Sequence, residues 1–178
     1  MEYKLPEGFN DRNEAIESLL KDEAGNAHSD LMSVKHIVES FLIEAKGYSD
    51  SELETDREFD VTVDGETAKS KVDIVISIDC MRLVSIICSA DAVVSRERHA
   101  LACARLLESY QIPFTVITDG MDAIVLDTVS GNVIGESPAA IPSKEQLVVL
   151  MAQTEFRELP VNRVEREKRI VRAFDAIG

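Results

Sequence analysis

Asp73 stands out among the residues that could do chemistry, because apolar residues surround it in the chain. Its carboxylate oxygens are the hard ligands that Mg²⁺ prefers. A second acid, Asp91, and a charged cluster at residues 95–99 follow further along. Carboxylates can bind a divalent metal ion, and an arginine such as Arg98 beside Glu97 can stabilise charge on a phosphate, so these residue types could take part in phosphate chemistry.

These charged residues also have structural interpretations. Asp73 could lie at a strand edge, facing solvent or bonded to a turn. Residues 95–99, Ser-Arg-Glu-Arg-His, are typical of the first turn of a helix with its charges in water. A literal Glu-x-Lys motif at residues 44–46 falls at a predicted helix end, where side chains two positions apart diverge, so we interpret it as solvated charges.

The net charge of −14 limits the partners that the chain can bind. Nucleic-acid binding depends on cationic contacts with phosphates, so an acidic chain repels DNA at long range. Residues 157–178 are locally basic, with six Lys/Arg against four Asp/Glu. Because acids are interleaved there, a solvated helix face is favoured over a phosphate-binding patch for Arg163, Arg166, Lys168, Arg169 and Arg172. Charge therefore disfavours DNA as a partner without excluding it.

The cysteines and histidines show no metal-ligand spacing, which disfavours a structural zinc site and favours structural roles. They are Cys80, Cys88, Cys103, His28, His36 and His99. No apolar run approaches the length of a membrane span, and the N-terminus lacks the apolar core of a signal peptide. We expect a cytoplasmic protein that binds no membrane.

Hydrophobic periodicity predicts helices and strands in a definite order in the first half of the chain. Apolar residues at helical spacing indicate helices over 11–23 and 30–46. The period then switches to two, which predicts three strands, 59–63, 72–78 and 83–89. The short connections at Asp64-Gly65 and Asp79-Cys80 predict that these strands form an antiparallel meander.

The second half of the chain predicts a helix over 95–110, strands over 114–118 and 123–127, and a hairpin-type turn at 129–133. A strand, helix, strand order favours a right-handed crossover, which makes 114–118 parallel to the strand that it joins. A helix with a capping box follows at Ser143, and a last amphipathic helix follows Pro160. The apolar side of that last helix leaves a homodimer open, although packing on its own domain is the simpler account.

These elements predict an α/β protein with an αβββαβ core, a mixed central sheet flanked by helices, and extra N- and C-terminal helices. The expected organisation is an N-terminal helical extension at 1–29, an α/β core at 30–140, and C-terminal helices at 141–178 that pack on the core or extend from it.

Two segments of the chain resemble parts of a known family. The first, GYSDSELETDREFDVTVDGETAKSKVDIVISID, has an x-Asp-hydrophobic motif at Val72-Asp73-Ile74-Val75. The second, SYQIPFTVITDGMDAIVLD, has a strand, Thr-Asp-Gly and strand pattern. With these segments, residues 30–135 resemble the N-terminal domain of type I restriction enzyme R subunits, the HsdR-N-like domains, and the αβββαβ order is the core of the PD-(D/E)XK nuclease fold to which that family belongs.

The resemblance implies a restriction-endonuclease-like fold with a degenerate site. In the family, an Asp on the second strand and a Glu on the third bind Mg²⁺, and a Lys two residues after the Glu stabilises developing charge. Aligned here, Ile87 takes the Glu position and Ser89 the Lys position, while the Gln-x-x-x-Tyr of the next helix is replaced near Ala102 and Leu106. Only Asp73 remains of the three catalytic residues.

Two hypotheses of function follow from this resemblance. The first is a nuclease-fold domain that lacks standard PD-(D/E)XK catalysis and acts as a binding or regulatory module linked to DNA restriction and modification, with protein subunits of such a system, or DNA, as partners. The second is a Mg²⁺-dependent endodeoxyribonuclease with a rearranged site around Asp73, in which Asp73 and Asp91 would be metal ligands and Glu97 and Arg98 further catalytic groups. A third possibility is a metal- or nucleotide-binding protein of other chemistry, although the sequence shows no Gly-rich phosphate loop.

Overall fold

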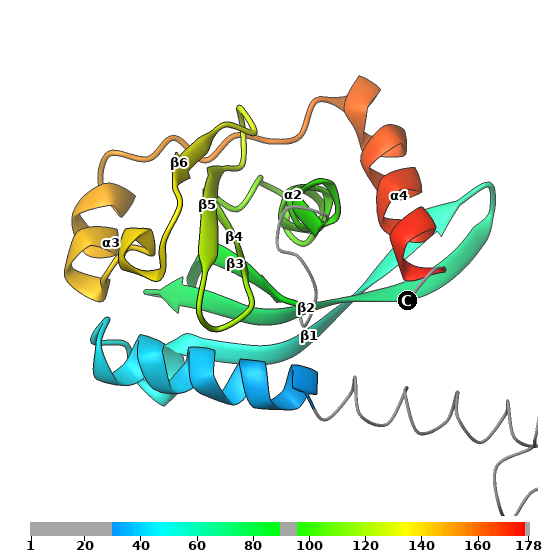
Figure 1. Ribbon diagram of the computed structural model, residues 1–178. Helices are drawn as coiled ribbons and strands as arrows, with labels where there is room; N and C mark the ends of the chain where they lie inside the picture. Colours follow the sequence, from blue (N-terminus) through cyan, green and yellow to red (C-terminus); the bar gives the residue numbers. More distant parts are fainter. Residues whose placement is uncertain (1–29, 90–95, 177–178) are drawn as a thin grey trace, which may run out of the picture.

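The computed structural model describes residues 30–89 and 96–176 (Figure 1). A helix at residues 30–44 opens this part of the chain. The elements that follow are η1 (Asp50–Glu52), β1 (Leu53–Val63), β2 (Glu66–Ile78), β3 (Met81–Cys88), α2 (Glu97–Leu106), β4 (Phe114–Thr118), β5 (Ala123–Asp127), β6 (Val133–Gly135), η3 (Pro138–Ala140), α3 (Lys144–Met151) and α4 (Val161–Asp175).

Six strands form one mixed sheet in the order β1-β2-β3-β4-β5-β6. The β3–β4 pair is parallel, and every other neighbouring pair is antiparallel. The parallel pair requires a crossover, which α2 supplies between β3 and β4. The predicted α/β class, the three-stranded meander and the parallel strand at 114–118 are therefore confirmed.

Two hairpin turns hold the meander together. Asp64 and Gly65 both have a positive φ, of 50° and 85°, and so do Asp79 and Cys80, with 48° and 64°. Two consecutive left-handed residues match the right-handed twist of the flanking strands, which is why Asp-Gly is favoured in such turns. Cys80 adopts this conformation without being glycine, at some local cost in backbone energy.

Helices cover both faces of the sheet and enclose two aliphatic core clusters (Figure 1). The first cluster joins helix 30–44 and α3 to the sheet and includes Val38, Leu42 and Leu147. The second joins α2 and α4 to the other face and includes Ala104 and Val171. The absence of tryptophan from the sequence agrees with a core built from aliphatic side chains.

Strands β1 and β2 change core faces at Asp56 and Asp73. The register pairs Thr55 with Ile74 and Arg57 with Val72, which puts the two aspartates opposite each other. Ile74 belongs to the first core cluster and Val72 to the second. The period of two that the sequence predicts for residues 72–78 would put Val72 and Ile74 on one face, so it does not hold at Asp73. Simple alternation fails where Asp56 adopts a left-handed φ of 50°.

Several element boundaries differ from the prediction. β1 begins at Leu53 and β2 at Glu66, each six residues earlier than expected. These added segments are rich in charged residues, so they show no apolar alternation and are held by backbone pairing. α2 ends at Leu106 instead of residue 110, because the chain turns back and the Ile112 N–H donates to the Ala104 carbonyl at 3.0 Å.

The C-terminal helices pack on the same domain. The predicted capping box of α3 is present, with Ser143 Oγ accepting from the Gln146 N–H at 3.3 Å. α4 buries Val171 completely in the second core cluster. None of the helices within 30–89 and 96–176 is long and apolar enough to cross a membrane.

The helix that the sequence predicts at 11–23 lies outside the described residues.

Candidate functional site

Asp73 lies in β2 with only 6% of its surface exposed, and both of its carboxylate oxygens are engaged. Oδ2 accepts a hydrogen bond from the Cys88 backbone N–H at 2.8 Å, at the end of β3. Oδ1 lies 2.9 Å from the Nζ atom of Lys35. Asp73 therefore ties three elements together: β2, β3 and helix 30–44.

Lys35 is the buried partner of Asp73, with 5% of its surface exposed. Its Nζ atom also donates to Asp56 Oδ1 at 2.5 Å, so one ammonium group bridges two carboxylates. Burial alone would lower the pKa of Lys35, but the hydrogen bonds to Asp56 and Asp73 outweigh burial and raise the pKa above its usual value. Lys35 is thus a permanent positive charge at neutral pH.

Asp56 and Lys71 complete the cluster on its solvent side, and about half of each side chain is exposed. Lys71 Nζ lies 2.8 Å from Asp56 Oδ1 and 4.0 Å from Asp73 Oδ1. Hydrogen bonds from Lys35 and then from Lys71 lower the pKa of Asp56. We call these four residues, Lys35, Asp56, Lys71 and Asp73, the Lys35 cluster; its two positive and two negative charges cancel.

The donor set at Asp73, as folded, does not fit Mg²⁺. A divalent cation needs free carboxylate oxygens around it, and here the space between the two carboxylates holds an ammonium group. Within the described ranges, no group of three or more His, Cys, Asp or Glu residues is arranged to hold a metal ion. In this state Lys35 neutralises the two carboxylates and positions helix 30–44 on the sheet.

The other predicted site residues are not joined to Asp73. Glu97 and Arg98 lie on the first turn of α2, half-buried and exposed respectively. No hydrogen bond or ion pair between either residue and Asp73 occurs in the part of the chain that the structure describes. Asp91 lies outside the described residues. The set of Asp73, Asp91, Glu97 and Arg98 therefore stays a prediction.

Ile87 and Ser89 lie near Asp73 but bring no catalytic group. Ile87 is buried and packs in the second core cluster, beneath α2. Ser89 is also buried, and its backbone N–H donates to the Thr118 carbonyl at 2.9 Å. Burial without a carboxylate or an ammonium group gives these two positions a packing role.

The remaining charged motifs have mostly structural partners. Lys46 donates to the Ala139 carbonyl at 2.8 Å. Asp119 accepts hydrogen bonds from the N–H groups of Met121 and Asp122, as expected of a turn residue. The basic residues of α4 that pair with an acid are Arg163, Lys168, Arg169 and Arg172.

A Cys-His-Asp contact lies between α2 and α4, and its histidine and cysteine are buried. His99 Nε2 is 3.4 Å from Cys103 Sγ and 3.3 Å from Asp175 Oδ1, and the ring stacks on Phe174. Burial raises the pKa of the Cys103 thiol, and burial lowers the pKa of His99 against the opposing effect of Asp175. A fully buried thiol is not a nucleophile, so this contact has a structural role.

Sequence reasoning missed Lys35, Asp56 and Lys71. Lys35 carried a signal, since it lies four residues after Leu31 and three before Val38, on the apolar stripe of the helix. A lysine on such a stripe is rarely buried unless it is paired. Asp56 and Lys71 lie outside the strands that the sequence predicts, so their spacing gave no indication that the two side chains would meet.

Comparison with known proteins adds one finding. A family model described as Type I restriction enzyme R protein N terminus (HSDR_N) matches residues 33–142, well over half of the chain. No curated protein and no solved structure matched. The matched segment contains all of the Lys35 cluster and ends just before α3.

Proposed function

The chain belongs to the family of type I restriction enzyme R protein N-terminal domains, and we propose that it is a binding or regulatory module of a restriction-type system. In this proposal it lacks standard PD-(D/E)XK catalysis. The observation that supports this most directly is the Lys35 ammonium group, which bridges Asp56 and Asp73 where a metal site would need free carboxylates.

The loss of the remaining catalytic groups supports the same proposal. In the alignment that we propose, Ile87 replaces the family's Glu and offers no metal ligand, and Ser89 replaces the Lys and carries no charge. Binding Mg²⁺ at Asp73 would also require Lys35 to leave its buried position, and an ammonium group without its partners is costly to bury. The cost of displacing Lys35 therefore supports a site without the usual Mg²⁺ chemistry.

The partners that we propose are protein subunits of the restriction-type system. The net charge of −14 opposes the approach of DNA, whereas protein surfaces carry mixed charges and impose no such barrier. DNA is the alternative partner, and it would have to use a locally basic face of the molecule.

One specific observation favours a second function, a Mg²⁺-dependent endonuclease with a rearranged site. Asp56 and Lys71 are half exposed beside Asp73, so carboxylates and a lysine do meet at the surface. Such a site would recruit Asp91 or Glu97 as a further ligand and Arg98 to stabilise charge, and Lys35 would have to withdraw from the carboxylates.

Cleavage of plasmid and oligonucleotide DNA by the pure protein, with Mg²⁺ or Mn²⁺, distinguishes the two functions. We expect no cleavage above that of Asp73→Asn, which keeps the shape of the side chain and removes its charge. Asp60→Asn, at an exposed position on β1, is the matched control. Cleavage that persists in Asp60→Asn and disappears in Asp73→Asn would establish the endonuclease and reject the binding module.

A further inference from the structure

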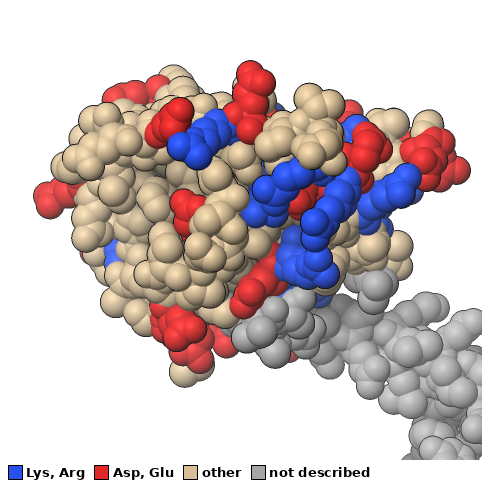
Figure 2. Space-filling model, turned by 90° about the horizontal axis from the view of Figure 1, so that it is seen from above, with Lys and Arg blue, Asp and Glu red and all other residues tan. Residues whose placement is uncertain are grey.

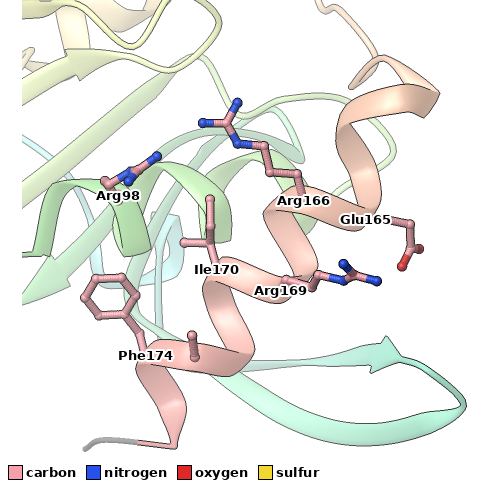
Figure 3. Close-up of a pocket in the computed structure, with 7 residues that line it drawn as sticks. Arg98, Glu165, Arg166, Arg169, Ile170 and Phe174 are labelled. Carbon is pink, nitrogen blue, oxygen red and sulfur yellow. The ribbon is translucent and has the colours of Figure 1, made fainter.

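A groove of about 480 Å³ lies between α2 and α4, and none of its lining residues belongs to the Lys35 cluster (Figure 3). Arg98 of α2 forms one wall, and α4 forms the other. The apolar floor consists of Ile170, Ala173 and Phe174. The volume is within the range of pockets that hold small organic ligands.

Arg98 and Arg166 point toward the same space above Ile170, whereas Arg169 and Glu165 point away from it (Figure 3). Both arginines are exposed. Neither has a hydrogen bond or an ion pair within residues 30–89 and 96–176, unlike the other basic residues of α4. Two guanidinium groups with no carboxylate between them offer paired donors to an anion.

The electrostatic surroundings favour an anion at this place. α4 carries five Lys/Arg against three Asp/Glu, in a chain whose net charge is −14. Figure 2 shows Lys and Arg side chains gathered on the side of the molecule where α4 lies. A small anion would therefore concentrate at the groove, away from the acidic remainder of the surface.

The floor of the groove is suited to a planar ring. Phe174 is half-buried and stacks on His99 with a centroid distance of 5.3 Å, which fixes the plane of its ring. Ile170 and Ala173 extend the apolar surface. A heterocyclic base can cover such a floor while its phosphate reaches the arginines.

We propose that the α2–α4 groove binds a nucleoside phosphate, with Arg98 and Arg166 on the phosphate and the base against Ile170 and Phe174. The ligand is either a free nucleotide or one unit of a single-stranded nucleic acid, which share this chemistry. The proposal goes beyond the function proposed above, because it assigns a ligand to a surface away from Asp73.

Calorimetric titration of the full chain with adenosine monophosphate at low salt tests the proposal. We expect adenosine, which lacks the phosphate, and ribose 5-phosphate, which lacks the base, each to bind at least about tenfold more weakly. Arg98→Gln and Arg166→Gln should each weaken binding of the nucleotide by about tenfold. Arg157→Gln removes an exposed arginine outside the groove and should leave the affinity unchanged.

A second titration, with a single-stranded hexanucleotide, tells whether the groove binds free nucleotides or a nucleic-acid strand. Tighter binding of a single-stranded hexanucleotide, lost in Arg98→Gln, assigns the groove to a nucleic-acid strand; binding no tighter than that of the mononucleotide assigns it to free nucleotides. The proposal is overturned if adenosine monophosphate does not bind, or if ribose 5-phosphate binds equally well. Affinity unchanged in both arginine variants, or binding of an acidic peptide in place of the nucleotide, overturns it too. Because the readout is binding, DNA cleavage does not affect this result.

Discussion

Lys35 neutralises two carboxylates that lie opposite each other on neighbouring strands. Like charges placed opposite each other across a strand pair destabilise a sheet, and Asp56 and Asp73 occupy such positions. The Lys35 ammonium group lies 2.5 and 2.9 Å from them and removes the repulsion. The lysine thereby fixes helix 30–44 on the sheet at the level where the strands change core faces.

Replacing Lys35 by methionine should destabilise the fold by about 3 kcal/mol, because Asp73 would remain buried beside Asp56 without its partner. Chemical denaturation with urea measures this change. Lys69→Met is the control, since Lys69 pairs with Glu58 at the surface and should shift the midpoint little. Adding Asp73→Asn to Lys35→Met should recover part of the lost stability. If Lys35→Met is as stable as the wild type, the cluster does not hold the helix in place.

His99 should make stability depend on pH near neutrality. Burial lowers its pKa in the folded state below the value near 6.5 of an unfolded chain. Between those two values the unfolded state binds more protons, so stability is complete above about pH 6.5 and is lost as the pH falls. We expect the melting temperature to fall on acidification from pH 7.5 to 5.5, by roughly 2–4 °C for each kcal/mol lost.

His99→Gln should flatten that pH dependence, while His36→Gln should retain it, because His36 is exposed. The groups that bear on His99 are Asp175, Arg96, Asp73 and the Cys103 thiol. Loss of the pair between Lys35 and Asp56 occurs in a separate, lower range, because the pKa of Asp56 is lowered. An unchanged slope in His99→Gln would assign the pH dependence to other groups.

At the level of helices and strands, the sequence predicts those elements in which buried apolar side chains recur with a regular period. Val72, Ile74, Ile76 and Ile78 mark the inner half of β2, and Ser143 with Gln146 marks the start of α3. The outer halves of β1 and β2 carry charged residues, and backbone pairing, which leaves no side-chain pattern, holds them together. The Lys35 cluster could not be predicted, because its members meet only through the register of β1 on β2 and the placement of helix 30–44.

The α2–α4 packing depends on a buried ion pair. Arg105 Nη1 donates to Glu167 Oε1 at 3.1 Å, and Arg105 Nε donates to the Thr128 carbonyl at 3.0 Å. Glu167→Ala should destabilise the fold by about 3 kcal/mol, because Arg105 would remain buried without its carboxylate. Urea denaturation measures the loss. Glu165→Ala, on the exposed side of the same helix, should change stability by less than about 0.5 kcal/mol. Equal losses in the two variants would contradict a special role for the buried pair.

Strand β3 offers a gain-of-function test of the family alignment. Ile87→Glu with Ser89→Lys adds the two groups that the proposed alignment expects there, but the Lys35 ammonium group would still occupy the space between the carboxylates. We therefore expect Mn²⁺ binding, followed by electron paramagnetic resonance, in the triple variant that also carries Lys35→Met, and at most weak binding in the double variant. Circular dichroism verifies that each variant is folded. A folded triple variant that binds no Mn²⁺ would show that Ile87 is not at the Glu position.

Charge is unevenly distributed over the whole molecule. The chain has a net charge of −14, while three arginines and one glutamate line the groove between α2 and α4. Within residues 30–89 and 96–176, most ion pairs are at least partly exposed, and such pairs contribute little individually. Repulsion among the excess acids therefore dominates the electrostatic free energy of the folded state.

This imbalance predicts that salt stabilises the protein at neutral pH. Raising NaCl from about 0.01 to 0.15 M shortens the screening length from roughly 30 to 8 Å, which weakens repulsion between distant acids more than attraction within close pairs. We expect the melting temperature at pH 7.5 to rise over this range in a scanning calorimeter. Near the sequence pI of about 4.6 the net charge vanishes, so the same salt step should have little effect there. A melting temperature that falls with salt at pH 7.5 would mean that the close pairs, foremost those of Arg82 with Glu54 and Glu108, outweigh the excess negative charge.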